Sequence, residues 1–535
     1  MTTYIIIYAI ALAATIPALA AELSRCLMML QQNSYRNERY MRWLRTSADS
    51  TSVPHLMGIF TFLAMLASMV PQAVGMLVAF LFCAIMAVRL ISAKYKKPLV
   101  WTPRARRIYI TALSLVAVIG AAIVIPLSIG TSPLNTLHVT ACVMVGAYVV
   151  SHCIIMAANW LLKPVESRIN GRFVEDARRI LRSMPELKVV GITGSYGKTS
   201  TKHFLTRILA EKYDTLMTPG SYNTTLGVVR TIRELMKPYT EVFVCEMGAK
   251  QPGDIAEICD LVHPSVGIVT AVGEQHLESF GSIDNVQRTK FELVDALPAD
   301  GLAVVNNDFE KCAERPVSNT ECIRYGITAP HGARFTAKDI RYSPRGTEFT
   351  VVDTQTGLEL PLSTALVGEC NISDLLAAVI VALRLGVEPQ KIAYAVSHIE
   401  PVEHRLQVKH TPGGITIIDD AYNSNPAGSR MAMEVLRQMT GGRRIVITPG
   451  MIELGDKQEE LNERLGVHIA TAADVAIIVG RYNRDALTRG IASVEGGTCR
   501  VETVDSFADA QRLLSTIAAP GDTVLYENDL PDTFK

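Results

Sequence analysis

The stretch Val190-Gly-Ile-Thr-Gly-Ser-Tyr-Gly-Lys-Thr-Ser200 joins an apolar run, residues 187–192, to a segment with helical periodicity. The run predicts a short buried strand, and the apolar spacing from Phe204 to Leu209 predicts a helix that begins near Lys198. A strand, a glycine-rich turn and a helix N-terminus together form an anion site. The reason is that unpaired backbone N–H groups and the helix dipole both point at the ligand.

The residues of this turn are typical of a phosphate-binding loop. Gly194 and Gly197 let the backbone close around phosphate oxygens, Lys198 supplies a positive charge, and the Thr199 hydroxyl can bind Mg²⁺. The spacing departs from the usual P-loop pattern, because Gly194 is the nearest upstream glycine. A purely structural turn is the alternative, and the flanking strand and helix favour phosphate binding.

Composition divides the chain of 535 residues into two regions. The formal net charge is zero, so there is no global electrostatic case for a nucleic-acid partner. Mean hydropathy is +0.22, and most of the apolar excess lies in the first 160 residues. The ten cysteines are scattered without metal-ligand spacing, which predicts free thiols in a reducing compartment or in lipid.

Residues 1–162 are predicted to form a transmembrane helical domain of about five spans. Apolar runs cover about residues 4–21, 53–70, 73–90, 108–129 and 137–162. A cleaved signal peptide or a buried helical core is the weaker alternative, because the first run lacks a basic n-region and the runs carry almost no charge. His152 is the main ionisable exception among them.

Charge between the runs predicts the orientation in the cell membrane. Residues 25–45 hold five arginines, residues 94–107 hold six basic side chains and no acid, and the connections at 71–72 and 130–136 are uncharged. The positive-inside rule therefore places the N-terminus outside and everything after Lys163 in the cytoplasm. Residues 163–186 are predicted to be a cytoplasmic linker, with a helical stripe at Val174, Ala177, Ile180 and Leu181.

After Leu187 the chain alternates strand and helix patterns, as in parallel α/β layers. Strands are expected at residues 242–246, 266–271, 302–306, 415–419, 444–448, 475–479 and 523–527. Polar residues follow three of them, namely Glu246, His276 and the pair Asp419-Asp420. Taken alone, each of these residues can be explained as a helix cap or as a packed side chain without a function. Together, downstream of a phosphate loop, they suit Mg²⁺ and ribose binding.

From Leu187 to the C-terminus the sequence resembles the Mur ligase family of peptidoglycan synthesis. Besides the loop at Gly194, the shared motifs are Thr218-Pro-Gly-Ser-Tyr-Asn-Thr-Thr-Leu-Gly227, Glu246-Met-Gly-Ala249, His276-Leu-Glu-Ser-Phe-Gly-Ser282, Lys290, Gly368-Glu-Cys-Asn-Ile372, Pro401-Val-Glu-His-Arg405 and Asp419-Asp-Ala-Tyr-Asn-Ser-Asn425. The His276 and Asp419 motifs and Met451-Ile-Glu-Leu-Gly455 are most similar to the MurF branch. The resemblance implies a central P-loop ATPase domain at 187–400 and a Rossmann-like domain at 401–535.

The resemblance also implies the activity. Enzymes of this family use ATP and Mg²⁺ to activate a muropeptide carboxylate as an acyl phosphate, then join it to an amine such as D-alanyl-D-alanine. By residue, it implies an ATP site of Thr193, Gly194, Ser195, Tyr196, Gly197, Lys198, Thr199, Ser200, Asn371 (adenine), Arg405 (phosphates) and Asp420 (ribose). It implies metal ligation by Thr199, Glu246, His276 and Lys290, and substrate contacts from Asn223, Thr224, Tyr422, Asn423 and Asn425. Of these, Lys198, Glu246, His276, Lys290 and Arg405 are expected to be catalytic.

Lys290 matches the family lysine that carries a carbamate. A lysine ammonium cannot bind Mg²⁺, whereas a carbamate presents carboxylate-like oxygens to it. Spacing alone favours a different reading, in which Lys290 is a surface lysine paired with an acid such as Glu292. The family resemblance favours the carbamate.

Two departures from the family pattern bear on the substrates. The usual N-terminal UDP-sugar domain has no evident counterpart, and Tyr526-Glu-Asn-Asp-Leu-Pro-Asp532 replaces a Lys-Gly-Ser-Arg type motif. The acceptor is therefore expected to be either a UDP-linked or a lipid-linked muropeptide. A ligase acting on another carboxylate, as in poly-γ-glutamate synthesis, and a membrane-anchored transport or signalling ATPase are the alternatives.

Overall fold

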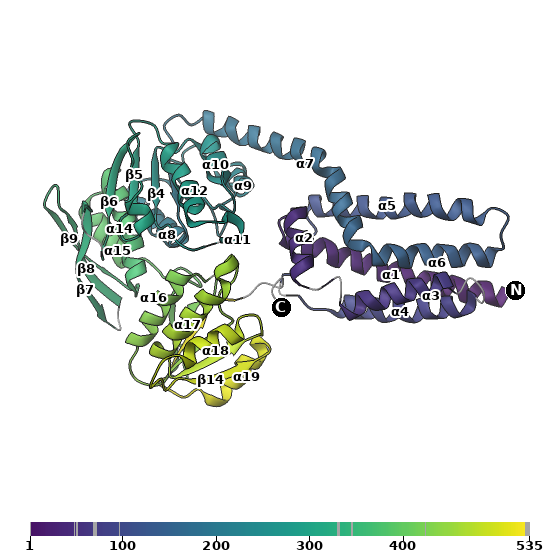
Figure 1. Ribbon diagram of the computed structural model, residues 1–535. Coiled ribbons are helices and arrows are strands. Elements are labelled where there is room, and N and C mark those ends of the chain that lie inside the picture. The colour runs from purple at the N-terminus through teal and green to yellow at the C-terminus, as the bar shows by residue number, and fades with distance from the viewer. Residues whose placement is uncertain are drawn as a thin grey trace. The chain divides into compact units, whose positions relative to one another are not determined.

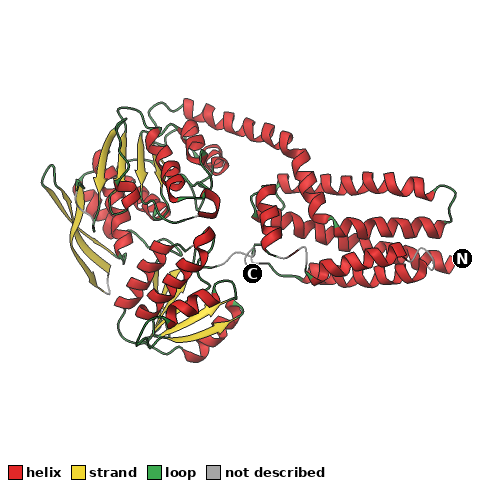
Figure 2. Ribbon diagram, in the orientation of Figure 1, coloured by secondary structure: helices red, strands yellow, loops and turns green. Residues whose placement is uncertain are grey.

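The computed structural model describes residues 2–47, 49, 52–67, 72–95, 97–275, 277–328, 332–343, 346–422 and 424–529. It divides into two compact units, Met1–Gly171 and Arg172–Asp529 (Figure 1). The first unit is helical, and the second contains two β-sheets covered by helices (Figure 2).

The first unit is built from helices, which are apolar except for the second, which is short and arginine-rich. They are α1 (Thr2–Gln32), α2 (Asn37–Thr46), α3 (Val53–Ala67), α4 (Gln72–Ser92), α5 (Pro103–Ser128), α6 (Pro133–Val149) and the beginning of α7 (Ser151–Arg182). α1 packs against α4, α5 and α6. Large apolar side chains also face outward, and Ile10, Leu77 and Val118 are more than half exposed. An apolar exterior over an apolar interior is what a lipid environment requires.

Three of these helices are long and apolar enough to cross a membrane, at Ile5–Gln32, Ala73–Ser92 and Pro103–Ser128. A fourth span is counted if α6 and α7 act as one, although they are bent by 75°. α3 is apolar but shorter, at 15 residues. The sequence predicted a continuous helix over residues 137–162, and the structure instead breaks it at Val150. The five-span count stays a prediction.

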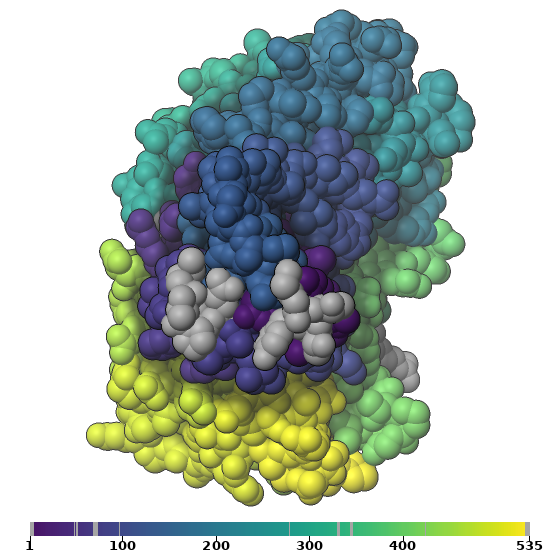
Figure 3. All heavy atoms as spheres, turned by 90° about the vertical axis from the view of Figure 1, so that its right-hand side faces the viewer, coloured from purple at the N-terminus to yellow at the C-terminus, as the bar shows by residue number. Residues whose placement is uncertain are grey.

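The turn between α5 and α6 is uncharged, as the sequence indicated. Thr102 and Ser132 begin the two helices, because each hydroxyl accepts a hydrogen bond from a backbone N–H three residues on. Gly130 takes a positive φ of 73° in the connection. The space-filling view in Figure 3 faces this end of α5 and α6, whose atoms are blue.

α7 extends well beyond the boundary that the sequence suggested at Lys163, as one helix from Ser151 to Arg182. Its last turns belong to the second unit. There Ala177 is fully buried in the core, and Val174, Ile180 and Leu181 pack against it. The apolar stripe therefore packs into the core of the second unit, and the role of this segment as a cytoplasmic linker stays a prediction.

The first sheet of the second unit has strand order β2-β3-β1-β4-β5-β6-β7-β8-β9. β7, β8 and β9 are antiparallel, and the other pairings are parallel. The strands are β1 (Lys188–Thr193), β2 (Thr215–Met217), β3 (Val242–Glu246), β4 (Val266–Val269), β5 (Leu302–Asn306), β6 (Glu321–Tyr325), β7 (Phe335–Ser343), β8 (Gly346–Asp353) and β9 (Leu358–Thr364). β2 and β6 to β9 were missed from the sequence.

Helices cover both faces of this sheet, because successive side chains of a strand point to opposite sides. Val190 and Ile192 of β1 face one core with α8, α14 and α15, and Val189 faces another with α9, α10 and α12. The helices are α8 (Lys198–Leu209), α9 (Thr225–Leu235), α10 (Asp254–Val262), α11 (Leu277–Phe280), α12 (Ile283–Asp295), α13 (Glu310–Ala313), α14 (Glu369–Arg384) and α15 (Pro389–Ser397).

The second sheet has the order β10-β11-β15-β12-β13-β14, and β10 alone is antiparallel to its neighbour. Its strands are β10 (Gln407–His410), β11 (Thr416–Asp420), β12 (Arg444–Thr448), β13 (Val475–Val479), β14 (Arg500–Val504) and β15 (Thr523–Glu527). Its helices are α16 (Pro426–Gln438), the 3₁₀ turn η2 (Gly455–Lys457), α17 (Gln458–Ala472), α18 (Arg484–Ala492) and α19 (Phe507–Ile517). The predicted α/β architecture is confirmed in both sheets.

Two glycines let α12 approach the centre of the first sheet. Gly191 of β1 and Gly267 of β4 are paired across the strands, and both face the Leu293 side chain of α12. A Cβ on Gly191 would lie 2.6 Å from Leu293 Cδ1 and 2.9 Å from Met247 Cε. Because α12 also carries Lys290, this close packing determines where that amine lies.

We expect Gly191→Ala to destabilise the second unit by about 1–3 kcal/mol, because the added methyl overpacks the core. The measurement is the thermal unfolding midpoint of the full-length protein in detergent. Gly171→Ala is the control, because Gly171 lies within α7 with nothing within 4 Å of an added Cβ. That variant should be unchanged or slightly stabilised. Equal midpoints for Gly191→Ala and the unmutated protein would contradict the packing argument.

Candidate functional site

The glycine-rich loop has the backbone geometry of an anion site. β1 ends at Thr193, and α8 begins at Lys198 directly after the loop. Gly194 and Gly197 have φ values of 152° and 77°, and a Cβ on Gly197 would lie 2.2 Å from Asp374 Oδ1. Only glycine fits these two positions. Two hydrogen bonds fix the loop to Gly273. Ser195 Oγ donates one to the Gly273 carbonyl and accepts one from the Gly273 N–H.

Lys198 extends along this loop. Its Nζ donates to the carbonyl oxygen of Gly194 at 2.7 Å and to that of Ser195 at 3.3 Å. Burial lowers the pKa of Lys198 to about 8, and Arg405 adds to the effect while Glu246 opposes it. A lowered lysine pKa means that the surroundings supply too little negative charge, as expected for a group that binds an anionic ligand.

Glu246 ends β3 with its side chain only 1% exposed. Thr199 Oγ1 donates to its Oε2 at 3.2 Å, and Asn223 Nδ2 donates to its Oε1 at 3.0 Å. Lys202 Nζ, also fully buried, lies 2.9 Å from Oε2. Burial alone would raise the pKa of Glu246, but the charges of Lys202 and Lys198 and the hydrogen bond from Asn223 outweigh it, so the pKa lies below its usual value.

The residues at this point fit a magnesium ion. Neighbouring ligands of an octahedral Mg²⁺ with oxygen distances of about 2.1 Å are separated by about 3 Å. Thr199 Oγ1 and Glu246 Oε2 are 3.2 Å apart, and both are hard oxygen donors. His276, the expected ligand of a second metal, lies outside the described residues.

Lys290 is buried rather than on the surface. Its side chain is 3% exposed, and within the described parts of the chain its Nζ has no hydrogen bond or ion pair. Burial lowers the pKa of Lys290 to about 7, and the charge of Lys198 adds to this. Glu292 instead accepts hydrogen bonds from the backbone N–H groups of Gly253, Ile255 and Ala256 at the start of α10. The reading of Lys290 as a surface lysine paired with Glu292 is therefore wrong.

Residues of the domain that holds the second sheet line the same pocket as the glycine-rich loop and Lys198. The Arg405 guanidinium lies 4.4 Å from the centre of the Tyr422 ring, and Asp420 accepts a hydrogen bond from the backbone N–H of Leu406. Burial raises the pKa of Asp420 to about 6, although Arg405 opposes the shift. The pocket lining includes these predicted residues: Ser195, Tyr196, Gly197, Lys198, Thr199, Ser200, Asn223, Glu246, Asn371, Arg405, Asp420, Tyr422 and Asn425.

For three of the predicted substrate residues, a role in substrate binding is not apparent from their positions alone. Thr224 is not among the pocket residues, and its hydroxyl begins α9 by accepting from the Gly227 N–H. Asn425 lines the pocket but also begins α16, where its Oδ1 accepts from the Gly428 N–H at 2.7 Å. Asn423 lies outside the described residues.

Sequence reasoning missed two buried groups at the loop, Lys202 and Asp374. Lys202 is one helical turn after Lys198, so this spacing was a usable signal. Asp374, on α14, lies against Gly197 and is 8% exposed, and burial raises its pKa well above the usual range. Its position three residues after Asn371 places both on one side of the helix.

Glu527 is a third group that was missed, at the end of β15 beside Asp420. It accepts hydrogen bonds from Ser424, which lines the pocket, and from Thr448 Oγ1 at 2.6 Å. Burial raises the pKa of Glu527 to about 7. The carboxyl group in the altered C-terminal motif thus lies behind the pocket, where it supports Ser424 of the lining.

We expect Glu527→Gln to change how stability depends on pH. The pKa of Glu527 is about 7 in the folded protein, against an ordinary value of 4.5. Its preference for the protonated form therefore contributes fully to the free energy of unfolding below pH 4.5. That contribution disappears as the pH rises through 7. Glutamine resembles the protonated acid, so between pH 5 and 8 the variant should gain up to about 3 kcal/mol relative to the unmutated protein. Unfolding midpoints measured across this range test the expectation.

Glu495→Gln is the control, because Glu495 is an exposed carboxylate in the same sheet domain. Its midpoint should follow that of the unmutated protein at every pH. If the difference in unfolding midpoint between Glu527→Gln and the unmutated protein stays constant from pH 5 to 8, Glu527 is ionised throughout this range and the expectation is wrong.

Comparison with known proteins gives two family matches. The Mur ligase middle domain matches residues 192–382, and the Mur ligase glutamate ligase domain matches residues 404–526. The UDP-N-acetylmuramoyl-tripeptide–D-alanyl-D-alanine ligase of Bacillus subtilis is 28% identical, over 64% of this chain and 72% of that protein. The ligase of the same name from Mycobacterium tuberculosis is 32% identical, over 63% of this chain and 70% of that protein.

A solved structure agrees with these sequence matches. The MurF ligase of Thermotoga maritima, in complex with ADP, superposes with a TM-score of 0.59 and 26% identity, covering 67% of this chain and 80% of that one. The matched region contains the glycine-rich loop, Glu246, Lys290 and Arg405. The chain therefore belongs to the Mur ligase family.

Proposed function

We propose that this protein is an ATP-dependent ligase of peptidoglycan precursors, which joins a muramoyl-tripeptide carboxylate to D-alanyl-D-alanine. The observation that carries the proposal is one pocket in which Lys198, Thr199 and Glu246 face Arg405 and Asp420. The curated relatives carry the name of this activity, and the match to them extends over both sheets.

In the proposed reaction the substrate carboxylate oxygen attacks the γ-phosphorus of ATP, and the bond to ADP breaks. The amine then attacks the acyl carbon, loses a proton, and phosphate leaves. Transfer of a phosphoryl group depends mainly on positioning and charge neutralisation. Lys198 and Arg405 supply positive charge to the phosphates, and Asp420 is mostly ionised above pH 6 and can accept from ribose hydroxyls. Asn371, in the first turn of α14, is assigned to the adenine.

Magnesium, held by Thr199 and Glu246, would neutralise phosphate charge. Lys202 supports this role, because its ion pair with Glu246 keeps the carboxylate ionised despite its burial. Asn223 holds the other oxygen and so fixes the orientation of the carboxylate.

Lys290 is assigned as a carbamate. Carbon dioxide reacts with a neutral amine, and a lysine whose pKa is about 7 is substantially neutral at cellular pH. The product carries a negative charge, which the nearby Lys198 stabilises, and its oxygens are suitable for Mg²⁺.

A lipid-linked tripeptide is a second candidate for the acceptor. The family match begins at residue 192, and the residues before Arg172 form an apolar helical unit. An enzyme held at the membrane meets other membrane-held molecules at a raised effective concentration. Basic residues in the loops at 25–45 and 94–107 attract anionic headgroups and pyrophosphates.

The function is tested by mass spectrometry of products from the full-length protein with ATP, Mg²⁺, D-alanyl-D-alanine and the UDP-linked tripeptide. We expect the mass of the pentapeptide with one ADP per product, and a loss of at least about 10²–10³-fold in Lys198→Ala. Lys188→Ala, an exposed lysine on the same strand as the loop, should keep full activity. ADP release with no ligated product would instead indicate an ATPase.

The same assay identifies the acceptor when the lipid-linked tripeptide is supplied in nanodiscs. Faster ligation of the lipid-linked form supports the second candidate. Efficient ligation of the UDP-linked form, with no gain from the lipid-linked form, excludes it.

Lys290→Ala should lower the rate by about 10²-fold or more, because it removes a ligand for the metal. Formate or acetate should restore part of the activity by occupying the same place. Lys311→Ala is the matched control, because Lys311 lies beside α12 and forms only surface ion pairs. A Lys290→Ala enzyme with a normal rate would contradict the carbamate assignment.

The topology is tested by labelling intact cells with a membrane-impermeant maleimide. We expect a cysteine at Thr131 to be labelled, and a cysteine at Lys94 to be labelled only after permeabilisation, because the basic loops face the cytoplasm. The parent protein, with its ten native cysteines, gives the background. Labelling of Lys94→Cys in intact cells would place the ligase domains outside the cell, away from ATP.

A further inference from the structure

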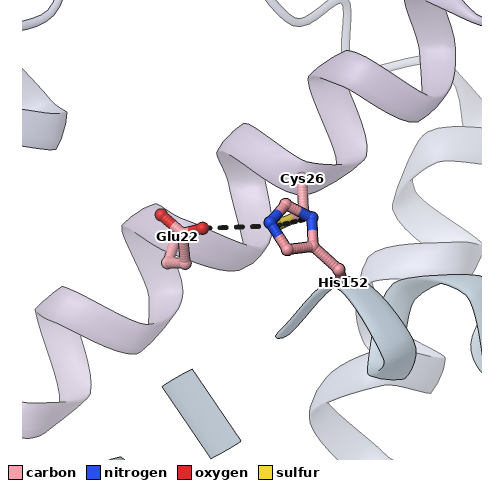
Figure 4. Close-up of side chains that lie close together, drawn as sticks. All are labelled: Glu22, Cys26 and His152. Carbon is pink, nitrogen blue, oxygen red and sulfur yellow. Dashed lines mark hydrogen bonds between the residues drawn. The ribbon is translucent and has the colours of Figure 1, made fainter. Parts of the chain in front are cut away.

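A cluster of charged and metal-binding side chains is buried in the helical unit, away from the ligase pocket. Glu22 and Cys26 project from one face of α1, one helical turn apart, toward His152 at the start of α7 (Figure 4). All three side chains are buried, and their ligand atoms lie within 4.8 Å of one another. Buried ionisable groups among apolar helices are costly, so such a cluster normally has a function.

The distances in this cluster match those between the ligands of a tetrahedral zinc ion. With a zinc–sulfur bond of about 2.3 Å and a zinc–nitrogen or zinc–oxygen bond of about 2.0 Å, neighbouring ligand atoms are about 3.5 Å apart. Cys26 Sγ lies 3.4 Å from His152 Nδ1 and 3.4 Å from Glu22 Oε1. Two edges of the tetrahedron are therefore already present.

The neighbours of His152 hold the imidazole in the orientation that metal binding needs. Its Nε2 lies 3.2 Å from Asp49 Oδ2 without hydrogen-bond geometry, so a small rotation of the ring would give the carboxylate contact that a ligand histidine commonly makes. The Nδ1 atom, on the opposite side, faces Cys26 Sγ and the Tyr40 hydroxyl, which lies at 2.6 Å. Zinc would replace this last contact, and the phenol oxygen or a water would be the fourth ligand.

Charge in the cluster also suits a divalent ion. Arg25 donates to both carboxylates, with Nη2 at 2.7 Å from Glu22 and 2.9 Å from Asp49. The two carboxylates and one guanidinium leave one negative charge. Zinc together with the Cys26 thiolate adds one positive charge, so the occupied cluster is neutral, as buried surroundings require.

We propose that Glu22, Cys26 and His152 form a zinc site that joins α1 to the start of α7. The combination of thiolate, imidazole and carboxylate favours Zn²⁺ over Mg²⁺ or Ca²⁺, which prefer oxygen ligands. His152 lies two residues after Val150, the residue between α6 and α7 at which the chain bends by 75°. The site would hold this bend against α1.

The test is the zinc content of the full-length protein, purified in detergent, stripped with a chelator and then equilibrated with Zn²⁺ and excess Mg²⁺. We expect the unmutated protein to hold one more zinc per chain than Cys26→Ala or His152→Gln. The matched controls are Cys83→Ala and His138→Gln, which alter buried side chains of the same unit outside the cluster. Both should retain the additional zinc.

A spectroscopic measurement on the unmutated protein does not depend on whether the variants fold. Co²⁺ in place of Zn²⁺ should give a thiolate-to-metal charge-transfer band, and X-ray absorption should find one sulfur in the first shell. Equal zinc content in the unmutated protein and Cys26→Ala, or a cobalt spectrum without the thiolate band, would overturn the proposal. Ligase activity is not used as a readout, so this outcome is independent of the proposed function.

Discussion

The ligase site depends on an excess of buried positive charge around the Glu246 carboxylate. Lys202 pairs with Glu246, but among the residues that the structure describes Lys198 and Lys290 have no carboxylate partner, and their pKa values fall to about 8 and 7. Burial raises the pKa of Asp374 well above its usual range, so it offers little compensation. In the proposed function a bound triphosphate would bring the missing negative charge, and Thr199 and Glu246 would hold the accompanying magnesium ion. The same electrostatics therefore explain both the low lysine pKa values and the preference for a nucleotide.

Much of this site could be predicted from the sequence, because its main parts are local. The glycine-rich loop, Lys198 and Thr199 lie within seven residues, and Glu246 follows a strand with a clear apolar pattern. The parallel strands were recognisable where the apolar runs were continuous. Strands β7 to β9 were missed because they alternate buried and exposed residues in an antiparallel ribbon between two longer patterns.

The remaining groups could not be predicted because their partners come from distant parts of the chain. Burial raises the pKa of Glu527 against the hydrogen bond from Ser424, which lies more than a hundred residues earlier in the chain. The burial of Lys290 follows from the paired glycines of β1 and β4, which local sequence does not reveal. In the helical unit, hydropathy gives the length of an apolar segment but not the direction of the helix axis. The bend at Val150 lies within a continuous apolar run and could therefore not be predicted.

The helical unit and the ligase unit follow opposite rules for the placement of charge. In the ligase unit most ion pairs lie at the surface, where water screens them and each contributes little. In the helical unit Glu22, Arg25 and Asp49 are turned inward and pair with one another. This placement is what a membrane location would require, because lipid offers no hydrogen bonds to charged groups on the outer surface. Their mutual pairing compensates part of the desolvation cost. It still leaves one uncompensated negative charge unless His152 or a bound cation balances it. A buried charge cluster that is neutral only with such a partner will select for that partner, whether it is a proton or a metal ion.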